Sequence, residues 1–400
     1  MTKNKNFSPF ITATFAFLFG IYAQSYELFS PVILLIILGI LTPVLFVSAI
    51  KNFHSKFTQV FACLIFFTLG AFSLTWQKNQ YANMIQEFDD KRMDLIAQVT
   101  NKTLLPTSKR SDWNSGTIDI QKGAWKEIIE ITVLQSKAAI GQDYDTHGTV
   151  GYTESCYKKA NFNLQCYSSS NTDIQVDDII KLEDVKIKIP QDKSLSQNTS
   201  YKNYLIKENL LASVFFYKNK NITILRSPKF SIRKFIWGIQ TSTYQRLQQK
   251  IHPTVFTYFS LMFLGNTHHK NIDTMRNTFN YWGLSHYLAR SGLHIVLFIL
   301  IWTIFLQLIP ISIRFKRSLL IIICITYKIF SWTSLPFTRA FYAFILTEIG
   351  KIFNFQTDFL HLLSIVCMTI LLFNPMQLFF LDFQLTFALT FALAFVSKFI

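Results

Sequence analysis

The sequence predicts a polytopic α-helical membrane protein with one inserted extracytoplasmic β domain of the small, OB-like type. Three observations support this fold class. Half of the 400 residues are hydrophobic and 16% are aromatic, a high apolar content for a soluble protein. The apolar residues fall in two blocks, which a long polar segment separates. In the first block, residues 31–50 carry no charge, and about twenty such residues form a helix that crosses roughly 30 Å of hydrocarbon.

The first block is predicted to hold three spans, at about 10–22, 31–50 and 57–76. A cleaved signal peptide is the alternative for the first span, because a basic start precedes it. No small-x-small cleavage site follows, however, and further spans come at once, so we expect this span to be retained.

Basic residues in the first block predict its orientation. Two lysines precede the first span, and Lys51 and Lys56 lie between the second and third. Cytoplasmic loops collect Lys and Arg, so the N-terminus is predicted to be cytoplasmic and residues 78–228 extracytoplasmic.

The second block begins with a basic amphipathic stretch, 230–250, which we expect to lie in the membrane interface. Residues 255–264 are too few to span the membrane, so an interfacial or re-entrant segment is predicted there. The basic loop 313–317 (IRFKR) is cytoplasmic if the span before it runs inward, in agreement with an external polar segment. About five spans are predicted, at 293–309, 318–332, 337–353, 359–373 and 383–395.

The polar segment is predicted to be mainly β. Short stretches are rich in β-branched residues or alternate in polarity, and Gly, Asn, Asp and Ser clusters separate them. Strands of this number and length indicate a small OB-like barrel. The predicted strands are 125–133, 148–152, 162–167, 179–189 and 222–225, with a short amphipathic helix at 200–209. The predicted domains are 1–77, 78–228 and 229–400.

The net charge of +16 would ordinarily indicate a nucleic-acid partner, so its position along the chain matters. Residues 78–228 contain 20 Lys and Arg against 18 Asp and Glu, a net charge of +2. The other 19 basic and 5 acidic residues, net +14, lie in and around the predicted spans. Much of the basicity is therefore expected to reflect membrane topology rather than a nucleic-acid-binding face.

The five cysteines have no metal-ligand spacing, and three of them lie in apolar runs. Cys156 and Cys166 are the pair in the polar segment. Outside the cytoplasm they could form a hairpin disulfide, and two free thiols remain the alternative. We expect no metal and no cofactor.

Residues 283–294 (GLSHYLARSGLH) concentrate polar and ionisable residues at the predicted entrance of a span. Such residues are costly at membrane depth and normally face a protein interior or a water-filled path. Ser285 or Ser291 could act as a nucleophile with a histidine as base, but no nucleophile-elbow motif and no suitably positioned acidic residue supports this hypothesis. The histidines lack the spacing of a zinc site. Hydrogen bonds that pack neighbouring helices remain an alternative role for them.

This stretch resembles the signature of the ComEC-type competence proteins, which runs roughly GLSHLLAISGLHV. The resemblance extends over nearly the whole chain in the same order. It includes FLG at 263–265 and 275–279 before the signature, SLPFTRA at 334–340, Asn374-Pro375 and FQLTF at 383–387 after it, and the helix-like 201–211.

The resemblance implies a channel that passes single-stranded DNA across the inner or plasma membrane during natural transformation. The OB-like domain would receive DNA by stacking bases on aromatic side chains beside a basic patch. Lys158, Lys159, Lys186 and Lys188 are the candidates for this patch. Aromatic residues on short strands are often core residues, which is the alternative for the candidate stacking residues Trp113, Trp125, Tyr152, Tyr157 and Tyr167.

Within the membrane, the resemblance implies a DNA path along the signature and the two motifs after it. Arg290 and Arg339 could attract phosphates there, or could pair with a carboxylate such as Glu348 or Asp382. The predicted path residues are Gly283, Ser285, His286, Arg290, Ser291, Gly292, His294, Arg339 and Gln384.

The sequence departs from the family pattern in three ways. Arg290 stands where the family usually has an apolar residue, and Asp382 where it usually has Gly. Many family members continue into a metallo-β-lactamase-like domain with an HxHxDH-type motif, which this sequence lacks. We therefore expect no enzymatic activity, and a shortened, non-functional family member is one alternative. A transporter or membrane scaffold for lipid or a small solute is another.

The expected partners are single-stranded DNA, membrane lipids, a separate DNA receptor and a cytoplasmic helicase or motor. A separate motor is expected because no GxxxxGK[ST] loop occurs. Homo-oligomerisation is compatible with a pore.

Overall fold

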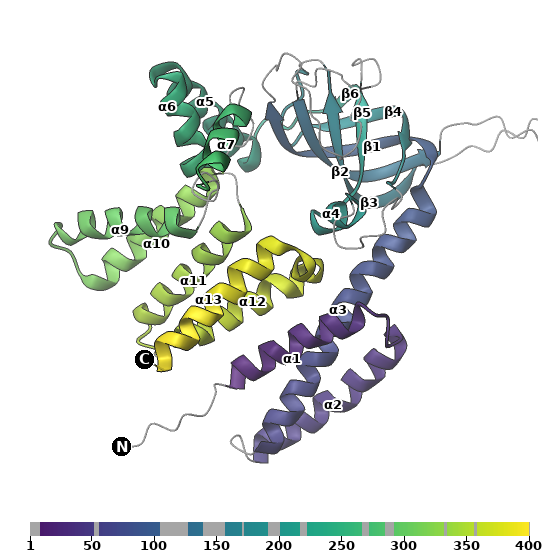
Figure 1. Cartoon of the computed structure of the whole chain (residues 1–400). Coiled ribbons are helices and arrows are strands. Elements are labelled where there is room, and N and C mark those ends of the chain that lie inside the picture. Colours follow the sequence, from purple (N-terminus) through teal and green to yellow (C-terminus); the bar gives the residue numbers. More distant parts are fainter. Residues whose placement is uncertain are drawn as a thin grey trace, which may run out of the picture. The chain divides into compact units, whose positions relative to one another are not determined.

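The structure is a computed structural model that combines helices with one mixed β-sheet (Figure 1). The chain divides into two units, Met1–Ala82 with Ala289–Ile400, and Asn83–Leu288. The described residues are 9–51, 56–104, 127–138, 157–169, 172–190, 201–216, 222–265, 272–284, 292–331, 334–355 and 358–399.

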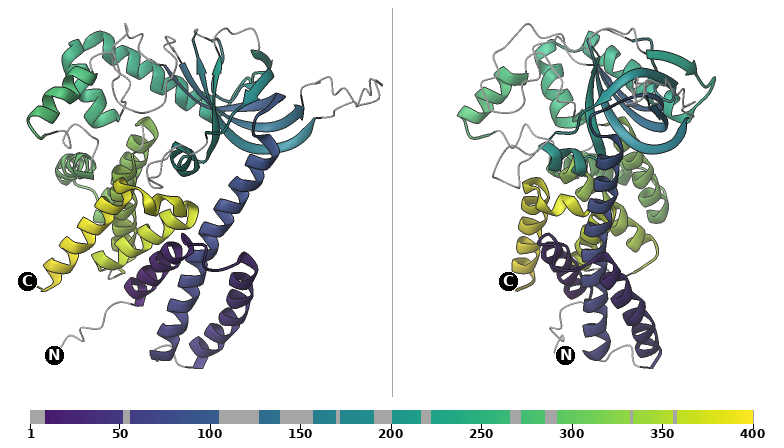
Figure 2. Two further views of the ribbon diagram at one scale, coloured as in Figure 1. Left: turned by 45° about the vertical axis from the view of Figure 1, so that its right-hand side comes forward. Right: turned by 90° about the vertical axis from the view of Figure 1, so that its right-hand side faces the viewer.

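The first unit begins with α1 (Pro9–Gln24), α2 (Pro31–Lys51) and α3 (Lys56–Phe88). Helices α1 and α3 cross at two glycines (Figure 2). A Cβ atom on Gly20 would fall on the carbonyl oxygen of Phe67, and one on Gly70 would fall on the carbonyl oxygen of Phe17. Small residues at such a crossing let two backbones touch, which is how helices in lipid gain packing energy.

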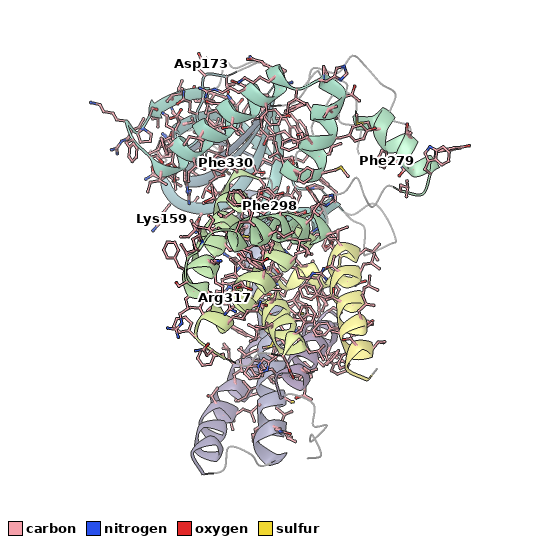
Figure 3. All side chains as sticks on the ribbon, turned by 90° about the vertical axis from the view of Figure 1, so that its left-hand side faces the viewer. Lys159, Asp173, Phe279, Phe298, Arg317 and Phe330 are labelled. Atoms are coloured by element: carbon pink, nitrogen blue, oxygen red, sulfur yellow. The ribbon has the colours of Figure 1, made fainter. Side chains whose placement is uncertain are left out.

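The first unit continues with helices from the second apolar block. Their core contains Ile295, Cys324, Phe337 and Phe341. In addition, Phe298 (labelled in Figure 3) stacks on Tyr327, with ring centroids 4.1 Å apart. The elements are α9 (Gly292–Gln307), α10 (Ile313–Phe330), α11 (Leu335–Ile352), α12 (Phe359–Phe373), η3 (Pro375–Phe379) and α13 (Leu381–Phe399).

Contacts between side chains join these helices to the first three. The ring of Phe10 on α1 lies 4.1 Å from that of His361 on α12. The Gln77 amide on α3 donates to Asn374 Oδ1 at 3.2 Å and accepts from the Met376 backbone at 3.3 Å. The two apolar blocks, far apart in sequence, therefore form one helical unit.

Within the described residues, one helical segment, Gln59–Phe88, is long and apolar enough to cross a membrane. Several other apolar helices in the described part are shorter, including Gly292–Gln307 and Phe359–Phe373. The number of spans and the side of the membrane therefore remain predictions.

The second unit contains a six-stranded sheet in the order β5-β3-β2-β1-β4-β6. Neighbouring strands are antiparallel, apart from β3 and β5, which run parallel. The strands are β1 (Lys91–Leu104), β2 (Glu127–Ala138), β3 (Lys158–Ser168), β4 (Ile179–Ile187), β5 (Leu210–Phe216) and β6 (Ile222–Arg226), and α4 (Tyr201–Lys207) precedes β5.

Strand β1 was not among the predicted strands, although it is the longest. Its buried residues alternate strictly over Met93, Leu95, Ala97 and Val99, the period-2 pattern of a strand with one face inward. Arg92 and Asp94 alternate with them and lower the apparent hydrophobicity. The predicted strand 148–152 lies outside the described residues.

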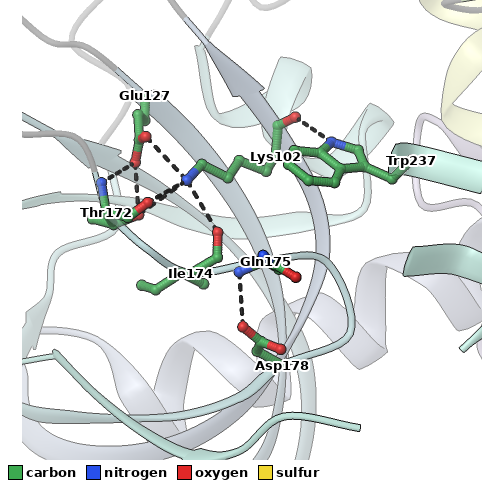
Figure 4. A network of polar contacts seen from close by, with 7 residues as sticks. All are labelled: Lys102, Glu127, Thr172, Ile174, Gln175, Asp178 and Trp237. Atoms are coloured by element: carbon green, nitrogen blue, oxygen red, sulfur yellow. Dashed lines mark hydrogen bonds and ion pairs between the residues drawn. The ribbon is translucent and has the colours of Figure 1, made fainter. Parts of the chain in front are cut away.

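A buried ion pair closes one end of the sheet (Figure 4). Lys102 Nζ on β1 lies 3.0 Å from Glu127 Oε1 on β2, and their side chains are only 6% and 1% exposed. Lys102 Nζ also donates to the Thr172 carbonyl at 2.7 Å and the Ile174 carbonyl at 3.0 Å, while Glu127 Oε2 accepts from the Thr172 hydroxyl at 2.7 Å. These hydrogen bonds compensate the charges for their lost hydration.

Two aspartates fix the segment that leaves the sheet. Asp177, at φ 73°, accepts from Gln98 Nε2 at 2.7 Å and from the Ser231 hydroxyl. Asp178 is 2% exposed and accepts from the Ser227 hydroxyl at 2.7 Å. The chain continues into α5 (Ile232–Lys250), α6 (Pro253–Phe259), η2 (Ser260–Leu264) and α7 (Ile272–Tyr281).

Helix α5 is bonded to the sheet. Trp237 Nε1 donates to the Lys102 carbonyl at 3.2 Å, and Lys234 Nζ lies 3.6 Å from Asp178 Oδ1. Phe230, Ile232 and Phe235 are 58–76% exposed. Exposed apolar and basic residues together are typical of an interfacial helix, and the interfacial position remains a prediction.

Candidate functional site

Gly283, the first residue of the signature, ends helix α7. Its φ is 67°, in the left-handed region that favours glycine. The Leu284 amide donates to the Phe279 carbonyl at 2.8 Å, and the Gly283 amide donates to the Asn280 carbonyl at 3.0 Å. This pair of bonds forms a Schellman motif, so the geometry accounts for Gly283 as a helix terminator.

Four predicted path residues, Ser285, His286, Arg290 and Ser291, lie outside the described residues. The signature resumes at Gly292, the first residue of α9. His294, two residues later, is 8% exposed and therefore faces the interior of its helical unit.

Gly292 and Arg339 are brought together by the packing of α9 against α11. A Cβ atom on Gly292 would lie 3.3 Å from Ala340 Cβ and 3.7 Å from an Arg339 guanidinium nitrogen. Because Gly292 has no side chain, the SLPFTRA motif can pack close to the start of α9. The sequence alone does not reveal this proximity.

Arg339 in turn reaches α13. Its guanidinium donates to the Thr386 carbonyl and to the Thr390 hydroxyl, and it lies 5.7 Å from the centroid of the Phe387 ring. The signature, the SLPFTRA motif and the FQLTF motif therefore meet around one arginine. The side-chain amide of Gln384, two residues before Thr386 on α13, donates to the Leu378 carbonyl at 2.9 Å.

Glu348, suggested above as a partner of Arg339, has other partners. Lys351 Nζ lies 2.6 Å from Glu348 Oε1, and Arg317 Nε lies 3.7 Å from Glu348 Oε2. Arg317 belongs to the basic stretch IRFKR. This stretch was predicted to be a loop, but in the structure it forms the first turns of α10. The carboxylate therefore compensates basic residues at that end of the helices, and Arg339 is held by neutral oxygens.

The four lysines of the candidate DNA-receiving patch lie at one end of the sheet. Lys158 and Lys159 begin β3, beside the end of β2, where Lys158 pairs with Ser136. Lys186 and Lys188 lie at the end of β4, beside the start of β1, where Lys186 pairs with Arg92. Two strands separate the pairs, a spacing of about 14 Å between β3 and β4.

The four lysines are not equivalent. Lys186 Nζ lies 2.6 Å from Asp90 Oδ1, and its hydrogen bond lowers the pKa of that carboxyl. Lys158, Lys159 and Lys188 are exposed, and Lys159 points away from the ribbon in Figure 3. Lys137, at the end of β2, lies 5.9 Å from the Tyr157 ring centroid and was not among the predicted residues. We call Lys137, Lys158, Lys159 and Lys188 the basic rim.

The disulfide prediction involves one described cysteine. Cys166 on β3 is 3% exposed, carries a free thiol and points into the sheet core. Burial raises the pKa of this thiol to about 12. Cys156 lies outside the described residues, so the disulfide remains a prediction. Among the described residues, no group of three or more His, Cys, Asp or Glu side chains could hold a metal ion.

Residues 262–400 match the sequence profile of the family described as Competence protein. Comparison with curated proteins and with solved structures gives no significant match. The matched segment contains the path residues from Gly283 to Gln384 and all helices from α7 onward.

The match defines the class: residues 262–400 form a competence domain, whose family is membrane-located, and this domain supports a role in DNA uptake. The domain at residues 262–400 supports a ComEC-type competence protein.

Proposed function

We propose that this chain is a channel component that passes single-stranded DNA across the inner or plasma membrane during natural transformation. The competence-domain match carries the proposal. The helices of residues 1–77 and 229–400 would form the polytopic membrane part, and residues 78–228 would receive DNA on the extracytoplasmic side.

The strand pairing supports an OB-like assignment of the receiving domain. Strand β1 pairs with both β2 and β4, and β3 pairs in parallel with β5. Such pairing joins non-consecutive strands, as in a small Greek-key barrel that binds oligonucleotides. The proposed boundaries of this domain, 78 and 228, lie within α3 and between β6 and α5, respectively.

The basic rim supports DNA as the ligand of this domain. The segment 78–228 has a net charge of only +2, but the register places Lys137, Lys158 and Lys159 together. Phosphate attraction depends on such local clusters rather than on the net charge of a domain. In the proposed membrane part, Arg339 and the signature residues would line the DNA path.

A genetic test separates function from fold. Deletion of the gene is expected to abolish uptake of added DNA and to leave growth intact. Complementation with the intact gene should restore uptake, and normal transformation in the deletion strain would contradict the proposal.

A binding test addresses the receiving domain. The full-length chain in neutral-lipid nanodiscs should bind a fluorescent (dT)20 oligomer with an affinity that falls with salt. Single strands give a log–log slope of about −0.7 per phosphate neutralised. Replacing Lys137, Lys158 and Lys159 by Gln should reduce the slope by about 2. Lys181→Gln is the matched control, because Lys181 Nζ already lies 2.7 Å from Glu183 Oε1.

The near neutrality of residues 78–228 favours one second candidate, a transporter or scaffold of the same fold for lipid or a small solute. It predicts no binding of (dT)20 even at low salt. The proposed partners of the DNA channel are a separate receptor, a cytoplasmic motor and further copies of this chain.

A further inference from the structure

The outer face of strand β3 carries one continuous row of side chains. Alternation along the strand turns Ala160, Phe162, Leu164 and Cys166 inward and leaves the residues between them outside. The outer residues, which we call the β3 strip, are Lys159, Asn161, Asn163, Gln165 and Tyr167. The strip starts in the basic rim.

The other end of the strip is aromatic. Tyr167 lies opposite Phe215 of β5 in the parallel register, and their rings stack with centroids 5.1 Å apart and planes 18° apart. Tyr201 and Tyr204 of α4 stack on each other with centroids 6.1 Å apart. The Tyr201 hydroxyl lies 2.7 Å from the Ser213 hydroxyl, which ties α4 to the outer face of β5.

None of these four aromatic side chains is fully buried. Phe215 is 39% exposed and Tyr204 is 42% exposed, whereas Val214 and Phe216, on either side of Phe215, are buried. The four rings are close together: Tyr201 and Tyr204 both contribute to raising the pKa of Tyr167, after the larger effect of burial. Exposed apolar side chains that are grouped, rather than scattered singly, are a common feature of interaction sites.

From this geometry we propose that the β3 strip is a single-stranded DNA track, on which bases stack against Tyr167, Phe215 and Tyr204 while phosphates at the other end contact Lys159. This inference rests on the proposed function and specifies where the DNA lies. The eight-residue step from Lys159 to Tyr167 covers about 26 Å, enough for roughly four nucleotides, the lower end of OB-fold site sizes.

Charge gives the track a direction. Lys137, Lys158 and Lys159 gather at one end, and Glu130 and Glu208 lie near the aromatic end, where both contribute to raising the pKa of Tyr204 after burial. Carboxylates disfavour a phosphate over the rings, so bases would face the rings there. The amides of Asn161, Asn163 and Gln165 lie between and can bond to phosphate, sugar or base edges.

The test uses the full-length chain in neutral-lipid nanodiscs and two fluorescent 12-mers of equal charge, (dT)12 and an abasic strand. Phe215→Ala and Tyr204→Ala should each weaken (dT)12 binding about 5-fold to 150-fold, the range expected for one lost base stack. Abasic-strand binding should be unchanged. Phe215→Trp should retain (dT)12 affinity. Leu225→Ala is the control, since Leu225 is 52% exposed on β6, at the opposite edge of the sheet.

Three results would overturn the inference. Unchanged (dT)12 affinity in both alanine variants would show that the rings do not stack on bases. Equal losses for both oligomers would show an effect that does not involve bases. Tighter binding of a chitin-type oligosaccharide than of (dT)12 would assign the face to glycans. If the unmodified chain binds neither oligomer, the proposed DNA-receiving role itself is wrong. If the alanine variants bind (dT)12 normally but Lys159→Glu weakens binding, the receiving role stands and only the proposed track is wrong.

Discussion

Gly20 and Phe67 mark a crossing of α1 and α3 at which no side chain separates the two backbones. Gly70 and Phe17 form the reciprocal contact at the same crossing. Lipid tails are as apolar as helix surfaces, so helices inside a membrane associate through close packing of this kind rather than through burial from water.

Gly20→Ala is expected to push α1 away from α3, because the new methyl group would fall on a backbone oxygen that cannot move aside. Overpacking of this kind costs about 1–3 kcal/mol, measurable as a lower midpoint of thermal unfolding in detergent. Gly39→Ala is the matched control. A Cβ atom there has nothing within 4 Å, so the midpoint should stay constant or rise slightly. Equal effects of the two substitutions would contradict the close crossing.

Glu127→Gln is expected to leave the charge of Lys102 buried without its counter-charge. Loss of one partner of a buried ion pair destabilises a protein by about 3–5 kcal/mol. Denaturant unfolding of the sheet, followed by circular dichroism, measures the loss. The double variant Lys102→Met, Glu127→Leu should recover much of it. Glu183→Gln, in the exposed pair with Lys181, should change stability by less than about 1 kcal/mol.

Thr390→Val is expected to weaken the contact between α11 and α13, since it removes an oxygen that accepts from Arg339. A hydrogen bond to a charged group contributes about 1.5–3 kcal/mol. Thr369→Val is the matched control, because each threonine hydroxyl donates to the carbonyl four residues earlier, and Thr390 in addition accepts from Arg339. The two thermal unfolding midpoints should therefore differ, and DNA uptake should fall in the Thr390 variant alone.

The Cys166 thiol is expected to resist alkylation at pH 8 until the domain unfolds, because its pKa is raised to about 12 and the thiolate is the reactive form. The folded state keeps the proton that the unfolded state releases near pH 9. This contribution to stability is present below pH 9 and is lost as the pH rises from 9 toward 12. Mass spectrometry after denaturation without reductant also tests the disulfide with Cys156: alkylation of both residues would exclude it.

Sequence patterns predicted those features that depend on neighbouring residues. Lys158 and Lys159 are adjacent in sequence, and the competence motifs are contiguous. The ion pair of Lys186 with Asp90 depends on the register between β1 and β4, which a pattern of residues does not specify. Strand β1 was missed for a related reason: its alternation is clear over Met93 to Val99, but charged residues on the outer face obscured it.

The stacking face could be predicted least. Tyr167 was a candidate by residue type alone, together with Trp113, Trp125 and Tyr152, which lie outside the described residues. Phe215 and Tyr204 join it only through the parallel pairing of β3 with β5 and the position of α4. Gly283 shows the opposite case, since a residue assigned to the DNA path is explained by its backbone conformation as the end of α7.

The buried ion pair has a practical consequence for labelling. Lys102 lies near the end of β1 and Glu127 begins β2, so their ion pair holds these two strand ends together. Lengthening a loop costs little in general, about 0.6 kcal/mol for each doubling of its length. An epitope inserted between these two strands should leave the sheet folded, and antibody access to it in intact cells would report on which side of the membrane the sheet resides.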